Sequence, residues 1–201
     1  MKGIVLISGG GSNLQSIIEN SSYIGLKIDC VISNNPDAYG LERAKIKGIK
    51  THVIDNNKFL SRNEFEVKLI EVIEKYNPEI IIFAGFMRIL TSNFTNKYLG
   101  KMINIHPSLL PKFQGLNTHE RALKANEKKH GVSIHFVTAE LDGGPIIAQK
   151  AIDILPSDNP NSLAKRVLIE EHKIYPIVLL WFAQGRLKLD NNVALLDNKP
   201  I

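Results

Sequence analysis

Five apolar segments separated by helical patterns limit the fold of this chain more than any other feature. They lie at residues 3–7, 26–32, 51–54, 79–84 and 101–106. Strands that are buried on both faces of a parallel sheet have such nearly continuous apolar runs, and helices connect one strand to the next. The first half of the chain is therefore expected to form a mostly parallel sheet with helices on both faces.

The pattern changes after residue 106. Residues 132–138 and 145–154 are expected to form two antiparallel strands, and a long helix is expected from Pro160 to about Ala183. A small hairpin is expected around Asn191. The whole chain is predicted to be an α/β protein with a Rossmann-like open twisted sheet, mostly parallel in its N-terminal half and antiparallel in its C-terminal strands.

Two helix starts have recognisable capping residues. Ser12 is expected to cap a helix through about Asn20. Ser61 and Glu64 form a capping-box pattern before an amphipathic helix. The apolar face of that helix is expected to consist of Phe65, Leu69, Val72 and Ile73.

Composition excludes several classes of protein. The formal net charge is +5, but the basic residues are scattered and form no stripe that would indicate nucleic-acid binding. The single cysteine, Cys30, allows no disulfide framework, and no His, Asp or Glu spacing indicates a metal site. No apolar run approaches a membrane span of ~20 residues, and the one at the N-terminus is too short for a signal peptide. A cytoplasmic protein with small-molecule partners is expected.

A glycine-rich turn follows the first strand, in the segment Ser8-Gly9-Gly10-Gly11-Ser12-Asn13. Backbone N–H groups at a helix start attract phosphate. No Gly-Lys-Ser/Thr follows, and Leu14 stands at the third glycine position of a dinucleotide fingerprint. The second strand is followed by Asn34 rather than by an acidic residue that would bind a ribose. A single phosphate monoester is the predicted ligand, and a plain glycine turn is the alternative.

Asn104 and His106 lie two residues apart at the end of a predicted strand and therefore point the same way. An amide and an imidazolium suit a reaction in which negative charge develops on a carbonyl oxygen. Asp142, in the turn before Gly143 and Gly144, is the candidate partner that would keep His106 charged. The alternative is that Asn104 and His106 bond to nearby backbone and that Asp142 is an ordinary turn residue.

Two further segments allow two interpretations each. Residues 83–90 stay apolar beyond Gly85, either because they pack under a helix or because they present a loop to a flat heterocycle. Arg88 would then meet an anionic tail of that ligand. Glu171 lies in the long helix, on a solvated face or in contact with a substrate amine.

Taken together, these motifs resemble the glycinamide ribonucleotide transformylase family of folate-dependent formyltransferases. The resemblance covers nearly the whole chain. It rests on residues 8–15, 84–90, 104–111, 135–137 and 141–145. It implies transfer of a formyl group from 10-formyltetrahydrofolate to the amine of a phosphoribosylglycinamide, without a metal, in purine biosynthesis. It also implies a single domain of residues 1–201, with a phosphate-binding half (1–100) and a catalytic and folate-binding half (101–201), as a monomer or weak homodimer.

The resemblance assigns a role to each matching residue. Asn104 and His106 would stabilise the tetrahedral oxyanion, with Asp142 keeping His106 protonated. The acceptor would be bound by Gly11, Ser12, Asn13 and Glu171. The folate would be bound by Arg62, Met87, Arg88, Ile89, Leu90, Asn104, Thr138, Ala139, Glu140 and Leu141.

The chain departs from the family pattern at two places, and three other functions remain to be distinguished. Gly10 stands where the family often has Asn, and residues 113–117 differ from its common Tyr-Pro-Gly-x-His sequence. The alternatives are a formyl-folate hydrolase, a formyltransferase acting on initiator tRNA and a non-enzymatic nucleotide-binding module. The first two relatives carry an additional N-terminal or C-terminal domain, for which 201 residues are expected to leave no room.

Overall fold

The computed structural model describes residues 1–201, and seven strands form a mixed sheet in the order β3-β2-β1-β4-β5-β6-β7. The prediction of a mostly parallel sheet with antiparallel C-terminal strands is confirmed. The chain divides into two compact units, Met1–Asn104 and Ile105–Ile201. The organisation as a single domain with halves that meet near residue 100 stays a prediction.

The first unit is built on parallel strands. They are β1 (Lys2–Ile7), β2 (Lys27–Ser33), β3 (Lys50–Val53), β4 (Ile80–Phe83) and the start of β5 (Met102–His106). Side chains of β1 from Ile4 to Ile7 are fully buried, as expected for a strand covered on both faces. Each predicted strand of this half is present.

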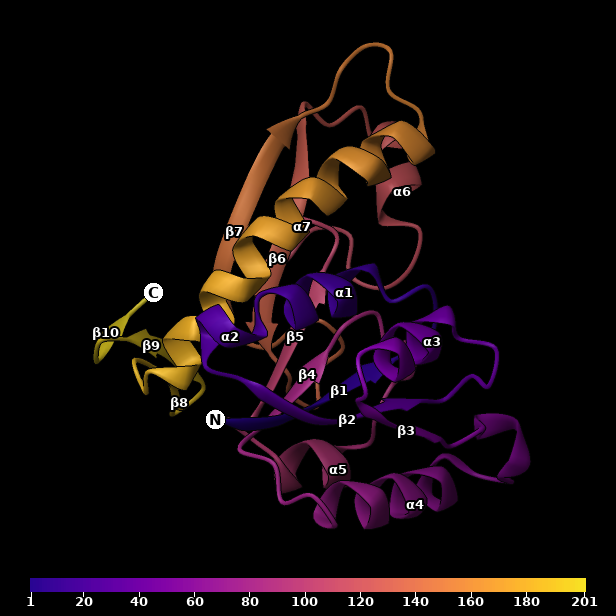
Figure 1. Ribbon diagram of the computed structural model, residues 1–201. Helices are drawn as coiled ribbons and strands as arrows, with labels where there is room; N and C mark the ends of the chain where they lie inside the picture. The colour runs from indigo at the N-terminus through magenta and orange to yellow at the C-terminus, as the bar shows by residue number, and fades with distance from the viewer. The chain divides into compact units, whose positions relative to one another are not determined.

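Helices cover both faces of these strands (Figure 1). On one side lie α1 (Ser12–Glu19), α2 (Ser21–Ile24) and α3 (Tyr39–Ile46). On the other side lie α4 (Arg62–Glu74) and α5 (Ser92–Lys97), while a short 3₁₀ helix, η1 (Asn56–Lys58), follows β3. The predicted apolar face of α4 is buried, with Phe65 and Leu69 almost without exposed surface.

The strand register places three chain turns at one edge of the first unit. Ile7 pairs with Ser33, and Leu6 pairs with Phe83. Because these strands are parallel, the glycine-rich turn after β1, the Asn34 turn after β2 and the loop after β4 all begin at their carboxyl ends. This is the edge at which ligands bind in open α/β sheets.

The second unit combines an antiparallel strand pair with a long helix. β6 (Lys129–Phe136) pairs antiparallel with β7 (Ile146–Asp153), as predicted. The helix α7 (Pro160–Ala183) packs against this pair, and α6 (Thr118–Lys124) contacts α7. A small antiparallel sheet of β8 (Leu187–Asp190), β9 (Val193–Leu196) and β10 (Lys199–Pro200) follows α7 in Figure 1.

The two predicted helix caps differ in detail from the structure. Gly11, not Ser12, is the N-cap of α1; it has φ 70°, and no side chain caps this helix. At α4 the Ser61 hydroxyl accepts from the Glu64 N–H at 3.2 Å, as predicted. The Glu64 carboxylate, however, accepts from the N–H of Leu60 at 3.1 Å, so the reciprocal half of the capping box is shifted by one residue.

Replacing Ser61 by alanine is expected to lower the free energy of unfolding by about 1 kcal/mol, because the Glu64 N–H loses its acceptor. Urea denaturation monitored by circular dichroism measures this change. Ser157→Ala, at an exposed position outside any helix, is the matched control and should leave stability nearly unchanged. Equal losses in the two variants would contradict the capping role.

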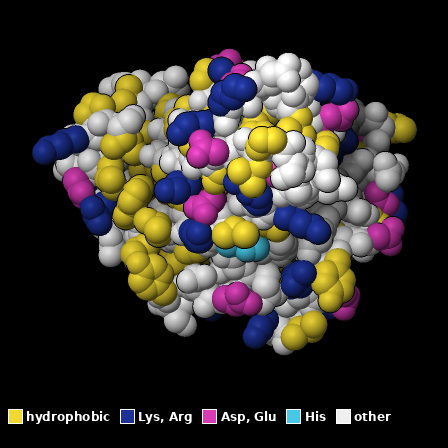
Figure 2. Space-filling model, turned by 90° about the horizontal axis from the view of Figure 1, so that it is seen from above, with side chains coloured by type: hydrophobic (Ala, Val, Ile, Leu, Met, Phe, Trp, Pro, Cys, Tyr) yellow, Lys and Arg dark blue, Asp and Glu magenta, His cyan; other side chains and the backbone are white.

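The surface charge is mixed on one face of the molecule (Figure 2), and the helices lack the combined length and hydrophobicity of membrane spans. Lys and Arg side chains are interspersed with Asp and Glu side chains on the face drawn in Figure 2. None of the helices has the length and apolar character needed to cross a membrane.

Candidate active site

The glycine-rich turn after β1 requires glycine for steric reasons. Gly11 has φ 70°, and a Cβ on it would lie 2.6 Å from the Cα of Gly40. The Gly40 N–H donates to the carbonyl of Gly9 at 3.0 Å, so the turn packs directly on the start of α3. A Cβ on Gly9 or Gly10 would meet nothing within 4 Å. The close backbone approach therefore explains Gly11 and Gly40, while Gly9 and Gly10 leave open space around the loop.

Side chains that sequence analysis did not assign hold this turn in place. The Arg43 Nε donates to the carbonyl of Gly10 at 2.8 Å. The Ser8 hydroxyl donates to the Asn34 side chain, and the Asn35 side chain donates to the carbonyl of Ser8 at 3.2 Å. In the sequence, Asn34 is notable because it stands where an acidic residue would bind a ribose. The position of Asn34 and Asn35 at a strand end is the signal for contacts with the neighbouring turn.

The start of α1 has the properties of an anion site. The helix begins at Ser12, directly after the turn, and Ser12 and Asn13 form its first residues. The helix dipole places partial positive charge at this end, where the first N–H groups point outward. The arrangement suits a phosphate group.

The segment after β4 is fixed at both ends. The Met87 N–H donates to the Ser8 hydroxyl at 2.7 Å, and the Thr91 N–H donates to Glu66 at 2.7 Å. Between these contacts Met87 is 63% exposed and Ile89 is 49% exposed. The structure therefore presents the segment as a loop, in agreement with one of the two interpretations.

Not every residue assigned to that loop faces outward. Arg88 is exposed, but Leu90 is 8% exposed and belongs to the core. Arg62 is exposed at the first position of α4 and has no hydrogen bond or ion pair to the Met87–Leu90 segment. The structure thus joins Met87 to the glycine-rich turn through Ser8, and it does not join Arg62 to this group.

Asn104 and His106 lie on β5 with Ile105 between them. Alternate side chains of a strand point to the same face, so the two polar groups share one face of β5. Asn104 is half-buried, and His106 is 6% exposed.

Both ring nitrogens of His106 face oxygen atoms. Nδ1 lies 3.4 Å from the Asp142 carboxylate, and Nε2 lies 2.9 Å from the carbonyl oxygen of Phe113. A carbonyl only accepts hydrogen bonds, so Nε2 carries a hydrogen in this contact. The Asp142 carboxylate lies beside the other ring nitrogen, so oxygen atoms flank both sides of the ring.

The turn that holds Asp142 is sterically specific. Asp142 has φ 48°, in the left-handed region that aspartate tolerates better than most residues. A Cβ on Gly144 would lie 1.9 Å from the Phe136 carbonyl oxygen, so only glycine fits there. The Asp142 side chain is 10% exposed, and its carboxylate accepts from the Gly115 N–H at 2.9 Å. The side chain is directed into the protein rather than into solvent.

His135 belongs to the same cluster, which the sequence did not reveal. Its Nδ1 contacts the Phe136 carbonyl oxygen at 2.8 Å, and its Nε2 lies 3.7 Å from the second carboxylate oxygen of Asp142. Burial lowers the pKa of His135, against the opposing effects of the Phe136 carbonyl and Asp142. His135 is 2% exposed, and its contact with Asp142 depends on the turn between β6 and β7, so it has no local signal in the sequence.

A second histidine pair lies on α6 and β6. His130 is 1% exposed, and its Nε2 lies 3.1 Å from the Nδ1 of His119. Burial, and then the positive charge of His119, lowers the pKa of His130 to about 4. Burial also lowers the pKa of His119. His130 is therefore a buried residue that resists protonation.

The His130 pKa predicts a loss of stability in acid. In the unfolded chain this histidine is protonated below about pH 6.5, whereas in the folded protein it is protonated only below about pH 4. The free energy of unfolding is therefore expected to fall by up to about 3 kcal/mol between these pH values from this residue alone. Urea denaturation at several pH values measures the fall, which should be smaller in His130→Asn. An unchanged pH dependence in that variant would contradict the assignment.

The remaining predicted residues divide between exposed and buried positions. Thr138 is half-buried, and Ala139, Glu140 and Leu141 are exposed in the segment that leads to Asp142. On α7, Glu170 is half-buried and pairs with Lys173 at 2.7 Å, whereas the neighbouring Glu171 is 7% exposed. No group of three or more His, Cys, Asp or Glu side chains is arranged to hold a metal ion.

Comparison with known proteins identifies the family. Residues 1–179 match the model of the formyl transferase family. The phosphoribosylglycinamide formyltransferase of Escherichia coli is 48% identical over 98% of this chain and 94% of its own length. The trifunctional purine biosynthetic protein adenosine-3 of Homo sapiens is 44% identical over 94% of this chain and 19% of its own length.

Solved structures agree with this result. The phosphoribosylglycinamide formyltransferase of Coxiella burnetii has a TM-score of 0.96 and 53% identity, covering 100% of this chain and 95% of its own. Glycinamide ribonucleotide transformylase 1 of Symbiobacterium toebii has a TM-score of 0.94 and 39% identity, covering 98% and 93%. The chain therefore belongs to the formyl transferase family and groups within it with the phosphoribosylglycinamide formyltransferases.

Proposed function

We propose that this protein transfers a formyl group from 10-formyltetrahydrofolate to the amine of 5′-phosphoribosylglycinamide in de novo purine biosynthesis. The observation that carries the proposal is the buried His106–Asp142 pair, whose atoms Nδ1 and Oδ2 are 3.4 Å apart. A charged imidazole at a strand end suits stabilisation of an oxyanion. The similarity to phosphoribosylglycinamide formyltransferases supports the same reaction.

The acceptor is bound through its phosphate and its amine or ribose. Gly11, Ser12 and Asn13 bind the phosphate at the start of α1, where the N–H groups and the helix dipole favour negative charge. Glu171, buried on α7, binds the amine or the ribose. This proposal gives a role to the open space around Gly9 and Gly10 and to a carboxylate that is kept out of solvent.

The folate is bound by two segments, residues 87–90 and 138–141, and by the single residues Arg62 and Asn104. Met87 and Ile89 supply exposed apolar surface to its ring system, and Arg88 contacts its anionic tail. Leu90 contributes through its backbone, because its side chain is buried. The other proposed folate contacts are Arg62, Asn104, Thr138, Ala139, Glu140 and Leu141.

Catalysis proceeds by direct attack of the neutral amine on the formyl carbon. A new C–N bond forms, and charge moves to the formyl oxygen, to which the Asn104 amide and the His106 ring donate hydrogen bonds. The C–N bond to the folate then breaks, and the proton of the attacking nitrogen passes to the departing nitrogen through His106 or an ordered water. The Phe113 carbonyl already accepts from Nε2 of His106, and Asp142 lies beside Nδ1. The formyl oxygen therefore shares the Nε2 hydrogen with the Phe113 carbonyl or replaces that carbonyl.

Product analysis with 10-formyltetrahydrofolate tests this function against its alternatives. Formylated acceptor should appear only when 5′-phosphoribosylglycinamide is added. Release of formate without acceptor would indicate a hydrolase, formylation of charged initiator tRNA would indicate the tRNA enzyme, and binding without either product would indicate a non-enzymatic module. The protein is further proposed to be cytoplasmic, to act without metal or nucleic acid, and to be a monomer or weak homodimer.

A further inference from the structure

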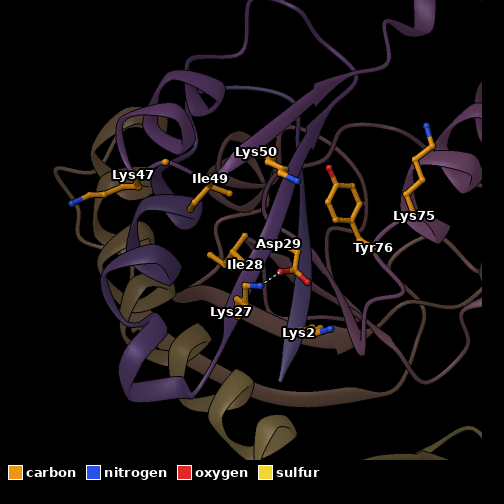
Figure 3. A pocket seen from close by; sticks show the side chains of 10 residues that line it. Lys2, Lys27, Ile28, Asp29, Lys47, Ile49, Lys50, Lys75 and Tyr76 are labelled. Carbon is orange, nitrogen blue, oxygen red and sulfur yellow. Dashed lines mark ion pairs between the residues drawn. The ribbon is translucent and has the colours of Figure 1, made fainter.

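A hollow lined by lysines lies in the first unit, at the amino ends of β1, β2 and β3 (Figure 3). Its volume is about 560 Å³. Its polar lining consists of Asp29, Tyr76 and five lysines, Lys2, Lys27, Lys47, Lys50 and Lys75. The hollow and the glycine-rich turn lie at opposite ends of β1, which is ~20 Å long at the usual rise per residue. This lysine hollow is therefore separate from the candidate phosphate site after β1.

The lysines concentrate positive charge that the protein neutralises only in part. Lys27 pairs with Asp29 at 3.1 Å, the ion pair drawn in Figure 3. Lys2, Lys47, Lys50 and Lys75 form no ion pair. Lys2 and Lys27 are register partners on adjacent strands, and like charges opposite each other destabilise a sheet. An anion in the hollow would relieve this repulsion.

The dipoles at helix C-termini account for the positions of only two of these lysines. Lys47 and Lys75 are the C-cap residues of α3 and α4, where the helix dipole favours a cation. Lys2, Lys27 and Lys50 instead begin three neighbouring strands, whose small dipoles give no such preference. All five lysines line one hollow, and this gathering of lysines is the feature that a ligand would explain. In Figure 3 the ammonium groups of Lys47 and Lys75 point away from those of the strand lysines.

The positive field reaches the polar groups at the wall of the hollow. The hydroxyl of Tyr76 lies 2.6 Å from the Nε2 of His52. Burial, followed by the charges of Lys75 and Lys50, lowers the pKa of His52. The ring of Tyr76 is half-buried and gives the hollow an aromatic wall among the ammonium groups.

We propose that the lysine hollow binds a chain of phosphate groups, as in inorganic tripolyphosphate or a nucleoside 5′-triphosphate. A volume of about 560 Å³ lies within the range of roughly 300–1,000 Å³ typical of small-molecule sites and is too large for one phosphate ion. Several ammonium groups suit a ligand with several negative charges. Tyr76 provides a surface for a base if the ligand is a nucleotide.

Lysine labelling locates the ligand directly. Reductive methylation of the intact protein, with and without tripolyphosphate or ATP, is followed by mass spectrometry of each lysine. Labelling of Lys2, Lys50 and Lys75 should slow when the anion is present, whereas exposed Lys58 and Lys188 should not change. Because the glycine-rich turn contains no lysine, an anion bound there does not produce this pattern. Uniform protection, or no protection at millimolar anion, would overturn the proposal.

Calorimetry with charge-matched variants separates a built site from net charge. Lys50→Gln/Lys75→Gln should weaken tripolyphosphate binding by about tenfold or more. Lys58→Gln/Lys188→Gln removes the same charge from exposed positions outside the hollow and should stay within about twofold of the unaltered protein. Equal weakening in both variants would overturn the proposal.

The choice of anion identifies the source of the phosphate chain. Tighter binding of ATP than of tripolyphosphate would indicate a nucleotide site, and equal binding would indicate an inorganic polyphosphate. A single-stranded oligonucleotide that binds more tightly than both would replace this proposal with nucleic-acid binding.

Discussion

Replacing His106 by asparagine is expected to lower kcat for formyl transfer by about 10²- to 10³-fold, the usual cost of losing an oxyanion donor. Asparagine retains a hydrogen-bond donor but carries no charge and is too short to reach the position of Nε2. The KM values for both substrates should change only a few-fold, because the proposed contact strengthens in the transition state. Steady-state kinetics with varied donor and acceptor measures both quantities.

His130→Asn is the matched control for this variant. His130 is also a buried histidine of the second unit, but it bonds to His119 and has no proposed role in catalysis. It should lose stability while keeping kcat within a few-fold. A His106→Asn variant that folds normally and turns over at the rate of the unaltered protein would remove His106 from the mechanism.

Replacing Asp142 by asparagine is expected to lower kcat by about 10²-fold, again with little change in KM. The asparagine oxygen can still accept from the Gly115 N–H, so the turn that holds residue 142 should keep its geometry. What the variant loses is the negative charge 3.4 Å from the His106 ring, and with it the preference for the charged ring. The same kinetic assay measures this loss.

Asp158→Asn provides the corresponding control. The Asp158 side chain is 2% exposed and pairs with Arg166 near the start of α7. Its replacement also removes a buried charge from an ion pair of the second unit, but away from His106, so stability should fall and kcat should not. If Asp142→Asn lost no more activity than Asp158→Asn, the charge of Asp142 would have no catalytic role.

The regular part of the fold could be predicted from sequence because its signals are local and repeated. The apolar runs located the strands of the first unit to within one or two residues, and the alternation with helices predicted a parallel sheet. The elements that the sequence did not reveal are α2, η1 and β10, which have four, three and two residues. Segments of this length are too short to display a hydrophobic period.

The N-cap of α1 shows why residue type alone misplaced a boundary. Serine is a good cap, so Ser12 was the natural choice. The turn that packs against Gly40 instead requires a left-handed residue directly before the helix, and Gly11 fills that position. A tertiary contact outweighed the local preference.

Only part of the candidate site could be predicted from the sequence, because only some of its residues have local signals. Asn104, His106 and Asp142 stood out through strand spacing and a glycine turn. His135, Arg43 and the Asn34–Asn35 pair did not, because their contacts join segments that are distant in sequence. The inward position of Leu90 was likewise hidden, since a run of apolar residues does not reveal which member faces the core.

The central claim is that Asp142 acts in catalysis through His106. A double-mutant cycle of His106→Asn and Asp142→Asn tests it most directly, with kcat measured for both single variants and for the double variant. If the carboxylate serves only to charge and orient the ring, the double variant should be no slower than His106→Asn alone. Losses that multiply in the double variant would show that the two residues act independently and would contradict the account.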